Sequence, residues 1–185
     1  MSEVMLKGQW FTSAMTVLRQ VCSPQQLEQI LDKCPAAGPM LRRNEVMSSG
    51  WYPVPPYVEL HKAMVAVMGP MVVEQVARIG TTIDVNSIFR FVLKLFSTDS
   101  VAKMGPRVFG TYCKVAGVRV LNSGPGRIES EIFDFFGAVP TIFEEAIISS
   151  ATFVSLGSGK DVQWKLLDGG KAGDVRARFE ITWPV

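Results

Sequence analysis

The chain is 185 residues long, and 48% of its residues are apolar while 19% are charged. These values suit a globular chain with a packed core, and they exclude a disordered chain, a collagen-like repeat and a disulfide-stabilised miniprotein. The 19 basic and 17 acidic residues give a net charge of +2, which is too balanced for a general nucleic-acid-binding protein.

The cysteine pattern and the start of the chain predict a cytoplasmic protein. The three cysteines, Cys22, Cys34 and Cys113, include no C-x-x-C pair, which argues against a disulfide framework or a zinc module. The first residues carry Glu3 and Lys7 and lack the apolar core of a signal peptide. The longest apolar run, residues 63–73, is too short to span a bilayer.

The first half of the chain has the periodicity of helices. Apolar spacing predicts an edge strand over 4–8 and helices over 10–22, 24–35, 55–68 and 71–79. Ser23 followed by Pro24 is typical of a helix start. Residues 35–53 are expected to form a loop, and Gly80 is expected to end the fourth helix.

Residues 87–96 carry apolar side chains around most of a helical circumference. A helix of this kind is typically buried at the centre of a fold. A following helix, capped by Thr98 or Asp99, is expected to be interrupted at Gly105 and Pro106.

From residue 115 onward the periodicity changes to that of strands. The predicted elements are strands over 115–121 and 127–133 around a turn at 122–126, a helix over 140–153, and strands over 161–167 and 175–183. Hairpin connections make the sheet antiparallel, so we expect an α+β fold with about four to five antiparallel strands and helices on one face. A single domain is expected over residues 1–185, helical over 1–113 and strand-rich over 114–185.

The sequence lacks the patterns that typically carry catalysis or bind metal. Residues 157–160 have only part of a phosphate-binding loop, and the next residue, Asp161, would repel a phosphate. No G-x-S-x-G motif is present, and one histidine with three scattered cysteines does not make a zinc site. We therefore predict a protein that is not an enzyme and that has no metal and no cofactor.

The single histidine, His61, borders the apolar stripe of the helix predicted over 55–68. A haem iron needs only one axial ligand, so this position is compatible with haem binding. The alternative is a histidine on the helix surface, which we favour because only Glu59 among its sequence neighbours offers a carboxylate to orient the ring.

Charge is unevenly distributed between residues 99 and 145. The basic residues of a candidate patch are Lys103, Arg107, Lys114, Arg119 and Arg127, and the run of residues 129–145 that follows is acidic. The basic residues either bind a phosphate-bearing ligand or acidic partner, or they form a solvated face that pairs with the acidic run across the hairpin.

Several motifs occur in a recognisable order. They are Trp51-Tyr52-Pro53, Pro106-Arg107, the turn at Gly126, Pro140-x-x-Phe143 and the ending Phe179-x-Ile181-x-Trp183. In this order they resemble a paralogous family of uncharacterised proteins abundant in myxobacteria. That family is similar to a fold group that includes 4-vinyl-reductase-type domains, haem–nitric-oxide-binding domains and Bet-type subunits of the TRAPP tethering complex.

The resemblance implies helices over one face of an antiparallel sheet, with an apolar cavity between them and dimerisation in some members. It does not imply a metal here, because residues 165–183 lack the cysteine cluster of some 4-vinyl-reductase-type relatives. The chain also lacks the Tyr-x-Ser-x-Arg pattern with which haem–nitric-oxide relatives hold the haem propionates.

Our leading hypothesis is a bacterial cytoplasmic regulatory protein that binds a small apolar molecule. The nine methionines support it, because flexible thioethers often line adaptable apolar pockets. The residues predicted to line the cavity are Trp51, Tyr57, Met64, Met68, Phe91, Phe109 and Tyr112. The alternatives are a homodimeric interaction adaptor or scaffold with a protein partner and, third, a haem-based gas sensor. No nucleic-acid partner is expected.

Overall fold

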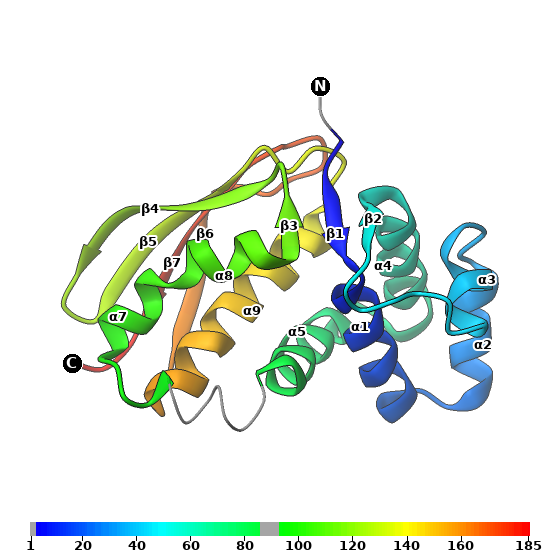
Figure 1. The fold of residues 1–185 in the computed structure, drawn as a ribbon, viewed down its shortest axis with the longest axis horizontal. Coiled ribbons are helices and arrows are strands. Elements are labelled where there is room, and N and C mark those ends of the chain that lie inside the picture. Colours follow the sequence, from blue (N-terminus) through cyan, green and yellow to red (C-terminus); the bar gives the residue numbers. More distant parts are fainter. Residues whose placement is uncertain (1–2, 86–92) are drawn as a thin grey trace.

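The computed structural model describes residues 3–85 and 93–185, and it forms two antiparallel sheets and a set of helices (Figure 1). The helices are α1 (Gly8–Val21), α2 (Pro24–Asp32), α3 (Ala37–Arg42), α4 (Val54–Met68), α5 (Met71–Asp84), α7 (Thr98–Lys103), α8 (Gly105–Tyr112) and α9 (Pro140–Ser158). The strands are β1 (Met5–Lys7), β2 (Trp51–Pro53), β3 (Cys113–Lys114), β4 (Gly117–Gly124), β5 (Arg127–Phe133), β6 (Gln163–Gly169) and β7 (Ala177–Thr182).

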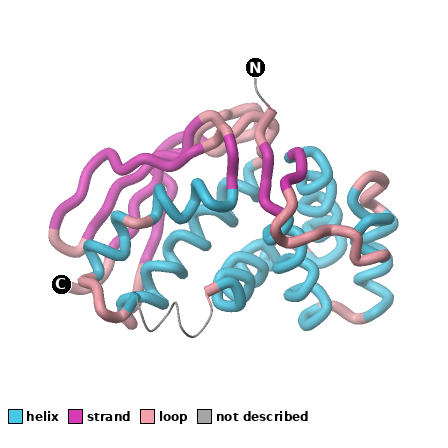
Figure 2. The backbone as a smooth tube through the Cα atoms, viewed as in Figure 1, coloured by secondary structure: helices cyan, strands magenta, loops and turns pink. Residues whose placement is uncertain are grey.

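The larger sheet has the strand order β4-β5-β7-β6, and each neighbouring pair is antiparallel. Helix α9 packs against β6 and β7 on the inner face of this sheet and against α5 on its other side (Figure 2). The expected α+β fold, with an antiparallel sheet covered by helices on one face, is confirmed.

The outer face of the larger sheet carries a ladder of ion pairs. Glu129 pairs with Arg178, and Glu131 pairs with Arg119. Lys165 Nζ lies 2.9 Å from Glu180 Oε1. The alternation of apolar and charged residues along β7 therefore places one set of side chains in the core and the other in this ladder.

The smaller sheet has the order β2-β1-β3, so β1 is its central strand. The prediction of an edge strand at the start of the chain is wrong in this respect, because β2 and β3 both hydrogen-bond to β1. The prediction of a loop over 35–53 also missed β2 and the short helix α3, both of which depend on contacts with distant segments.

Several helix boundaries follow from local signals. Ser23 caps α2 in a capping box with Gln26, and Pro24 occupies the first turn. Ser97, rather than Thr98 or Asp99, caps α7 through the backbone N–H of Ser100. Helix α9 runs five residues beyond its predicted end and stops where Gly159 adopts φ 68°.

Gly80 does not end α5, which continues to Asp84. A Cβ added at Gly80 would lie 3.7 Å from the Cβ of Ser13 on α1. The glycine therefore lies where α5 passes close to α1, which explains its presence inside the helix.

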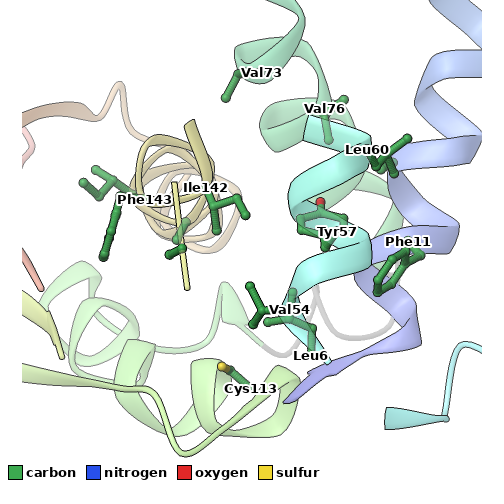
Figure 3. Packing of buried hydrophobic residues seen from close by; sticks show 14 of the residues in the cluster. Leu6, Phe11, Val54, Tyr57, Leu60, Val73, Val76, Cys113, Ile142 and Phe143 are labelled. Carbon is green, nitrogen blue, oxygen red and sulfur yellow. The ribbon is translucent and has the colours of Figure 1, made fainter. Parts of the chain in front are cut away.

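The main core lies where α1, α4 and α9 meet. Figure 3 shows Tyr57 on α4 between α1, which carries Phe11, and α9, which carries Ile142 and Phe143. The rings of Phe11 and Tyr57 are 4.9 Å apart between centroids. Of the 19 residues of α9, 11 are buried, so α9 is the buried central helix of the described chain. The predicted central helix over 87–96 falls mostly outside the described residues.

Candidate functional site

A cavity of about 130 Å³ lies between α1, α5, α8 and α9. Its apolar lining includes Trp10, Ala14, Val76, Phe109, Ala146 and Phe153. Its polar lining includes Ser13, Thr81, Asp84, Tyr112, Glu145 and Ser149. An engineered apolar cavity of roughly 150 Å³ in another protein binds benzene, so this cavity has the size for a single aromatic ring.

A buried polar cluster lies at the α9 side of the cavity, and its member Glu145 lines the cavity. The Tyr57 hydroxyl donates to Glu145, with Oε1 2.8 Å away. His61 Nε2 lies 2.6 Å from Glu145 Oε2, and His61 Nδ1 lies 3.1 Å from Thr141 Oγ1. Burial, together with the charge of Glu145, raises the pKa of Tyr57 well above its ordinary value, so Tyr57 acts as a hydrogen-bond donor.

This cluster arises from two helical pairs of identical spacing. Tyr57 and His61 are four residues apart on α4, and Thr141 and Glu145 are four residues apart on α9. Residues at this spacing share one face of a helix, and α4 packs against α9. The sequence contains both pairs, but it does not show that their faces meet.

The expectation that His61 is a surface histidine without an orienting group is therefore wrong. Its side chain is 0% exposed, and its orienting carboxylate comes from Glu145, which is 84 residues away in the chain. An ionised carboxylate only accepts hydrogen bonds, so the proton on Nε2 points to Glu145. Both ring nitrogen atoms are then engaged.

A second carboxylate lines the cavity at the end of α5. Asp84 Oδ1 accepts hydrogen bonds from Gln9 Nε2 at 2.7 Å and from Ser13 Oγ at 2.5 Å. Burial raises the pKa of Asp84 above its ordinary value, and the charge of Glu145 raises it further, against the lowering effect of the two hydrogen bonds. Asp84 therefore sits in an environment that disfavours its charge.

The residues predicted to line the cavity are distributed over several places. Phe109 and Tyr112 line it. Tyr57 does not line the cavity itself but contacts two residues that do. Its hydroxyl donates a hydrogen bond to Glu145, and its ring centroid lies 5.4 Å from that of Trp10. Met64 is fully buried and Met68 is half-buried, both in the core around α4. Phe91 falls outside the described residues.

Trp51 lies on β2 rather than at the cavity wall. The ammonium groups of Lys114 and Lys7 lie 4.1 and 5.7 Å from its ring centroid. These cation–π contacts hold the small sheet together at its surface.

The predicted basic patch divides into separate contacts. Arg119 pairs with Glu131, and Arg127 Nη1 lies 3.7 Å from Glu180 Oε2. Lys103 and Arg127 line a surface groove of about 200 Å³ together with Asp99. Arg107 is exposed on α8. Arg119 and Arg127 therefore pair with carboxylates of the sheet. This favours the interpretation of a solvated face over that of a binding patch for a phosphate or an acidic partner.

The cavity residues missed by the sequence analysis are chiefly Trp10, Asp84, Glu145 and Phe153. Glu145 was counted only as part of an acidic run. One usable signal was present, because Glu145 falls on the apolar face of a helix that also carries Ile142 and Ile148. Within residues 3–85 and 93–185, no group of three or more metal-ligating side chains comes together, and no helix has the length and hydropathy to cross a membrane.

No family model matches the chain, and no curated protein matches its sequence. Solved structures do match. An H-NOX protein from K. algicida superposes with a TM-score of 0.73 at 10% identity and covers 97% of both chains. An H-NOX protein from S. oneidensis in its Fe(II)NO state gives a TM-score of 0.68 at 11% identity, over 97% of this chain and 100% of the other.

The chain has the H-NOX fold. An oxygen-binding H-NOX domain related to soluble guanylate cyclases also matches, with a TM-score of 0.64 at 11% identity over 96% of this chain and 95% of that one.

The described residues around the cavity do not fit a haem. Among them only Tyr112 offers an iron ligand, and burial raises the pKa of its hydroxyl and so disfavours the phenolate. Asp84 and Glu145 would repel the haem propionates, and the lining contains no lysine or arginine among the described residues. The cavity of about 130 Å³ has the size for a single aromatic ring, which is far less than a porphyrin needs. We therefore assign no role to haem.

Proposed function

We propose that this chain is a non-enzymatic regulatory domain that binds a small, largely apolar molecule in the cavity between α1, α5, α8 and α9. The observation that carries the proposal is a ring-sized cavity with aromatic lining from Trp10, Phe109 and Phe153 in a fold whose solved relatives include ligand-binding domains. Ligand pockets in proteins combine an apolar lining with few polar groups in this way.

The chemistry of the side chains supports binding rather than catalysis. Burial raises the pKa of the Cys34 and Cys113 thiols to about 12, which keeps them protonated and poorly nucleophilic. Both ring nitrogen atoms of His61 contact other side chains, Thr141 and Glu145. His61 is therefore not available to act as a base toward a hydroxyl group in the cavity.

Thermal unfolding with toluene as the probe tests the proposal. A ligand that binds only the folded state raises the unfolding temperature, so toluene is expected to stabilise the wild-type chain. Gly80→Leu would carry three carbon atoms beyond its Cβ into the cavity and is expected to abolish the shift.

Gly80→Ala is the matched control, because its added methyl group meets Ser13 at an ordinary distance of 3.7 Å. The alanine variant should keep the response to toluene. The absence of any shift in the wild type, together with native mass spectra that show no retained small molecule, would contradict the proposal.

The haem-based gas sensor is the alternative that the fold itself suggests. We expect that adding haem to the purified protein gives the absorption spectrum of free haem, because the described cavity residues supply neither a suitable axial ligand nor a cation for the propionates. A saturable one-to-one haem complex would favour the gas sensor over our proposal.

The function as a homodimeric adaptor stays a prediction. The relationship to a myxobacterial family also stays a prediction. The exposed apolar side chains of Leu121 on β4 and Leu166 on β6 lie on the two outer strands of the sheet.

A further inference from the structure

We propose that the ligand of this cavity is a small organic cation, an alkylammonium group attached to a single aromatic or similarly compact ring, with Asp84 as its counter-charge. This proposal rests on the proposed function and names the chemical class of its ligand. Three features of the cavity support it: the sign of its charged groups, a free oxygen on Asp84, and its aromatic lining.

All charged side chains known to line the cavity are carboxylates. Asp84 and Glu145 line it, and no lysine or arginine does among the described residues. The two carboxylates are close enough that the charge of Glu145 acts on Asp84. An anionic ligand would therefore be repelled, whereas a cation would relieve the repulsion.

Among the described residues no cation pairs with Asp84, although its position disfavours a negative charge. Its two hydrogen-bond donors, Gln9 and Ser13, are neutral. It is the last residue of α5, whose last turn contains no basic residue. The carbonyl end of a helix carries a partial negative charge, so a carboxylate there lowers stability unless a cation binds beside it.

One oxygen of Asp84 remains available to a ligand. Both donors bind Oδ1, and no described residue donates to Oδ2. No fully buried side-chain oxygen of the described residues lacks a hydrogen-bond partner, so Oδ2 must be accessible. Since Asp84 lines the cavity, an ammonium group inside the cavity can reach this oxygen.

Glu145 has a different role from Asp84. Its carboxylate already accepts the Tyr57 hydroxyl and faces His61 Nε2. It therefore contributes negative potential to the cavity while α4 holds its side chain in place.

The aromatic lining suits the same class of ligand. Trp10, Phe109, Tyr112 and Phe153 all line the cavity, and the rings of Trp10 and Phe109 are nearly perpendicular, 6.5 Å apart. Aromatic rings attract organic cations and also pack against a ring on the ligand. Four aromatic side chains with two carboxylates therefore match a ring-bearing alkylammonium ion, such as protonated benzylamine, better than a neutral hydrocarbon.

The test compares benzylamine with benzyl alcohol, its neutral counterpart of similar shape, by calorimetric titration of the purified protein. In the wild-type chain at pH 7.5 we expect benzylamine to bind about tenfold or more tightly than benzyl alcohol, because hydrogen bonds to charged groups are stronger than neutral ones. Asp84→Asn should remove most of this preference and change the affinity for benzyl alcohol by less than about twofold.

Asparagine retains the Oδ1 acceptor for Gln9 and Ser13, so this variant separates the charge from the structural role of Asp84. Asp161→Asn is the control, because Asp161 is an exposed aspartate that also accepts a hydrogen bond from a glutamine, Gln163. It should retain the wild-type preference for benzylamine.

A second measurement on the wild-type chain does not depend on the folding of any variant. Benzylamine affinity should fall as the pH is lowered through the raised pKa of Asp84, while benzyl alcohol affinity changes less. The other titratable groups that face or adjoin this site are Glu145 on α9, Tyr112 on α8, and Tyr57 and His61 on α4.

Equal affinity for the two probes in the wild type, or a preference for benzylamine that Asp84→Asn leaves intact, would overturn the cation proposal and leave the proposed function standing. Failure of the wild type to bind benzylamine, benzyl alcohol or toluene would overturn both.

Discussion

The outer face of the larger sheet and the wall of the cavity hold buried carboxylates in opposite ways. Glu129 and Glu131 are 7% and 5% exposed, and each pairs with an arginine. Glu145 is equally buried, but its partners are a histidine and a hydroxyl. Within the described part of the chain, arginines therefore pair with the buried carboxylates of the sheet, whereas no lysine or arginine lines the cavity.

The difference follows from where the partners can reach water. Arg119 and Arg178 are 61% and 49% exposed, so their guanidinium groups stay hydrated while they cover the glutamates. A lysine or arginine inside the cavity would fill it and lose its hydration. The hydroxyl and amide donors of Ser13 and Gln9 bind Asp84 without adding a positive charge to the cavity.

The largest effect is expected from the replacement His61→Leu. This change removes the nitrogen partner of a buried carboxylate and should lower the free energy of unfolding by about 3–5 kcal/mol, measured by urea denaturation. The double variant His61→Leu with Glu145→Leu should recover part of the loss. If the free energy of unfolding falls by less than about 1 kcal/mol, the contact between His61 and Glu145 contributes no more than a surface ion pair.

A smaller effect is expected from Tyr57→Phe. The ring and its contacts with Phe11 remain, but Glu145 loses one donor, so unfolding should become easier by about 1–3 kcal/mol. Tyr52→Phe is the matched control, since the Tyr52 hydroxyl accepts a hydrogen bond from the exposed backbone N–H of Met47 and from no other described residue. Equal losses for the two variants would contradict a special role for the buried cluster.

Asp84→Asn should change how stability depends on pH. The pKa of Asp84 is raised in the folded chain, so the folded state binds its proton more tightly than the unfolded state. Its charge therefore destabilises the fold as the pH rises above the ordinary aspartate value, 3.8, and this cost is absent at lower pH. The asparagine variant should gain stability relative to the wild type from pH 4 to pH 7 in denaturant titrations. A constant difference across this range would contradict it.

The smallest effect is expected on the outer face of the sheet, from Arg127→Ala. Arg127 is 48% exposed, and Glu180 keeps its partner Lys165 after the change. Exposed ion pairs contribute little, so the free energy of unfolding should change by less than about 0.5 kcal/mol. A change above about 2 kcal/mol would mean that the ladder acts as a buried network.

The same contrast shows which features of the molecule are predictable from sequence. The alternation along β7 gives both the inward apolar side chains and the outward charges, because successive residues of a strand point to opposite faces. Tyr57 and Glu145, in contrast, lie 88 residues apart and meet only because α4 packs against α9. The periodicity of either helix by itself does not predict which other helix it packs against.

The sequence by itself determined the α+β class, the existence of the hairpin before residue 133, most helix starts and the absence of catalytic motifs, because each depends on residues close together in the chain. The turn of that hairpin is shorter than the predicted 122–126, because residues 122–124 belong to β4. The tertiary structure decided that β1 is a central strand, that His61 is buried, and that Asp84 and Glu145 face one cavity. These features depend on which helix faces meet, and that choice is made by the packing of the whole core.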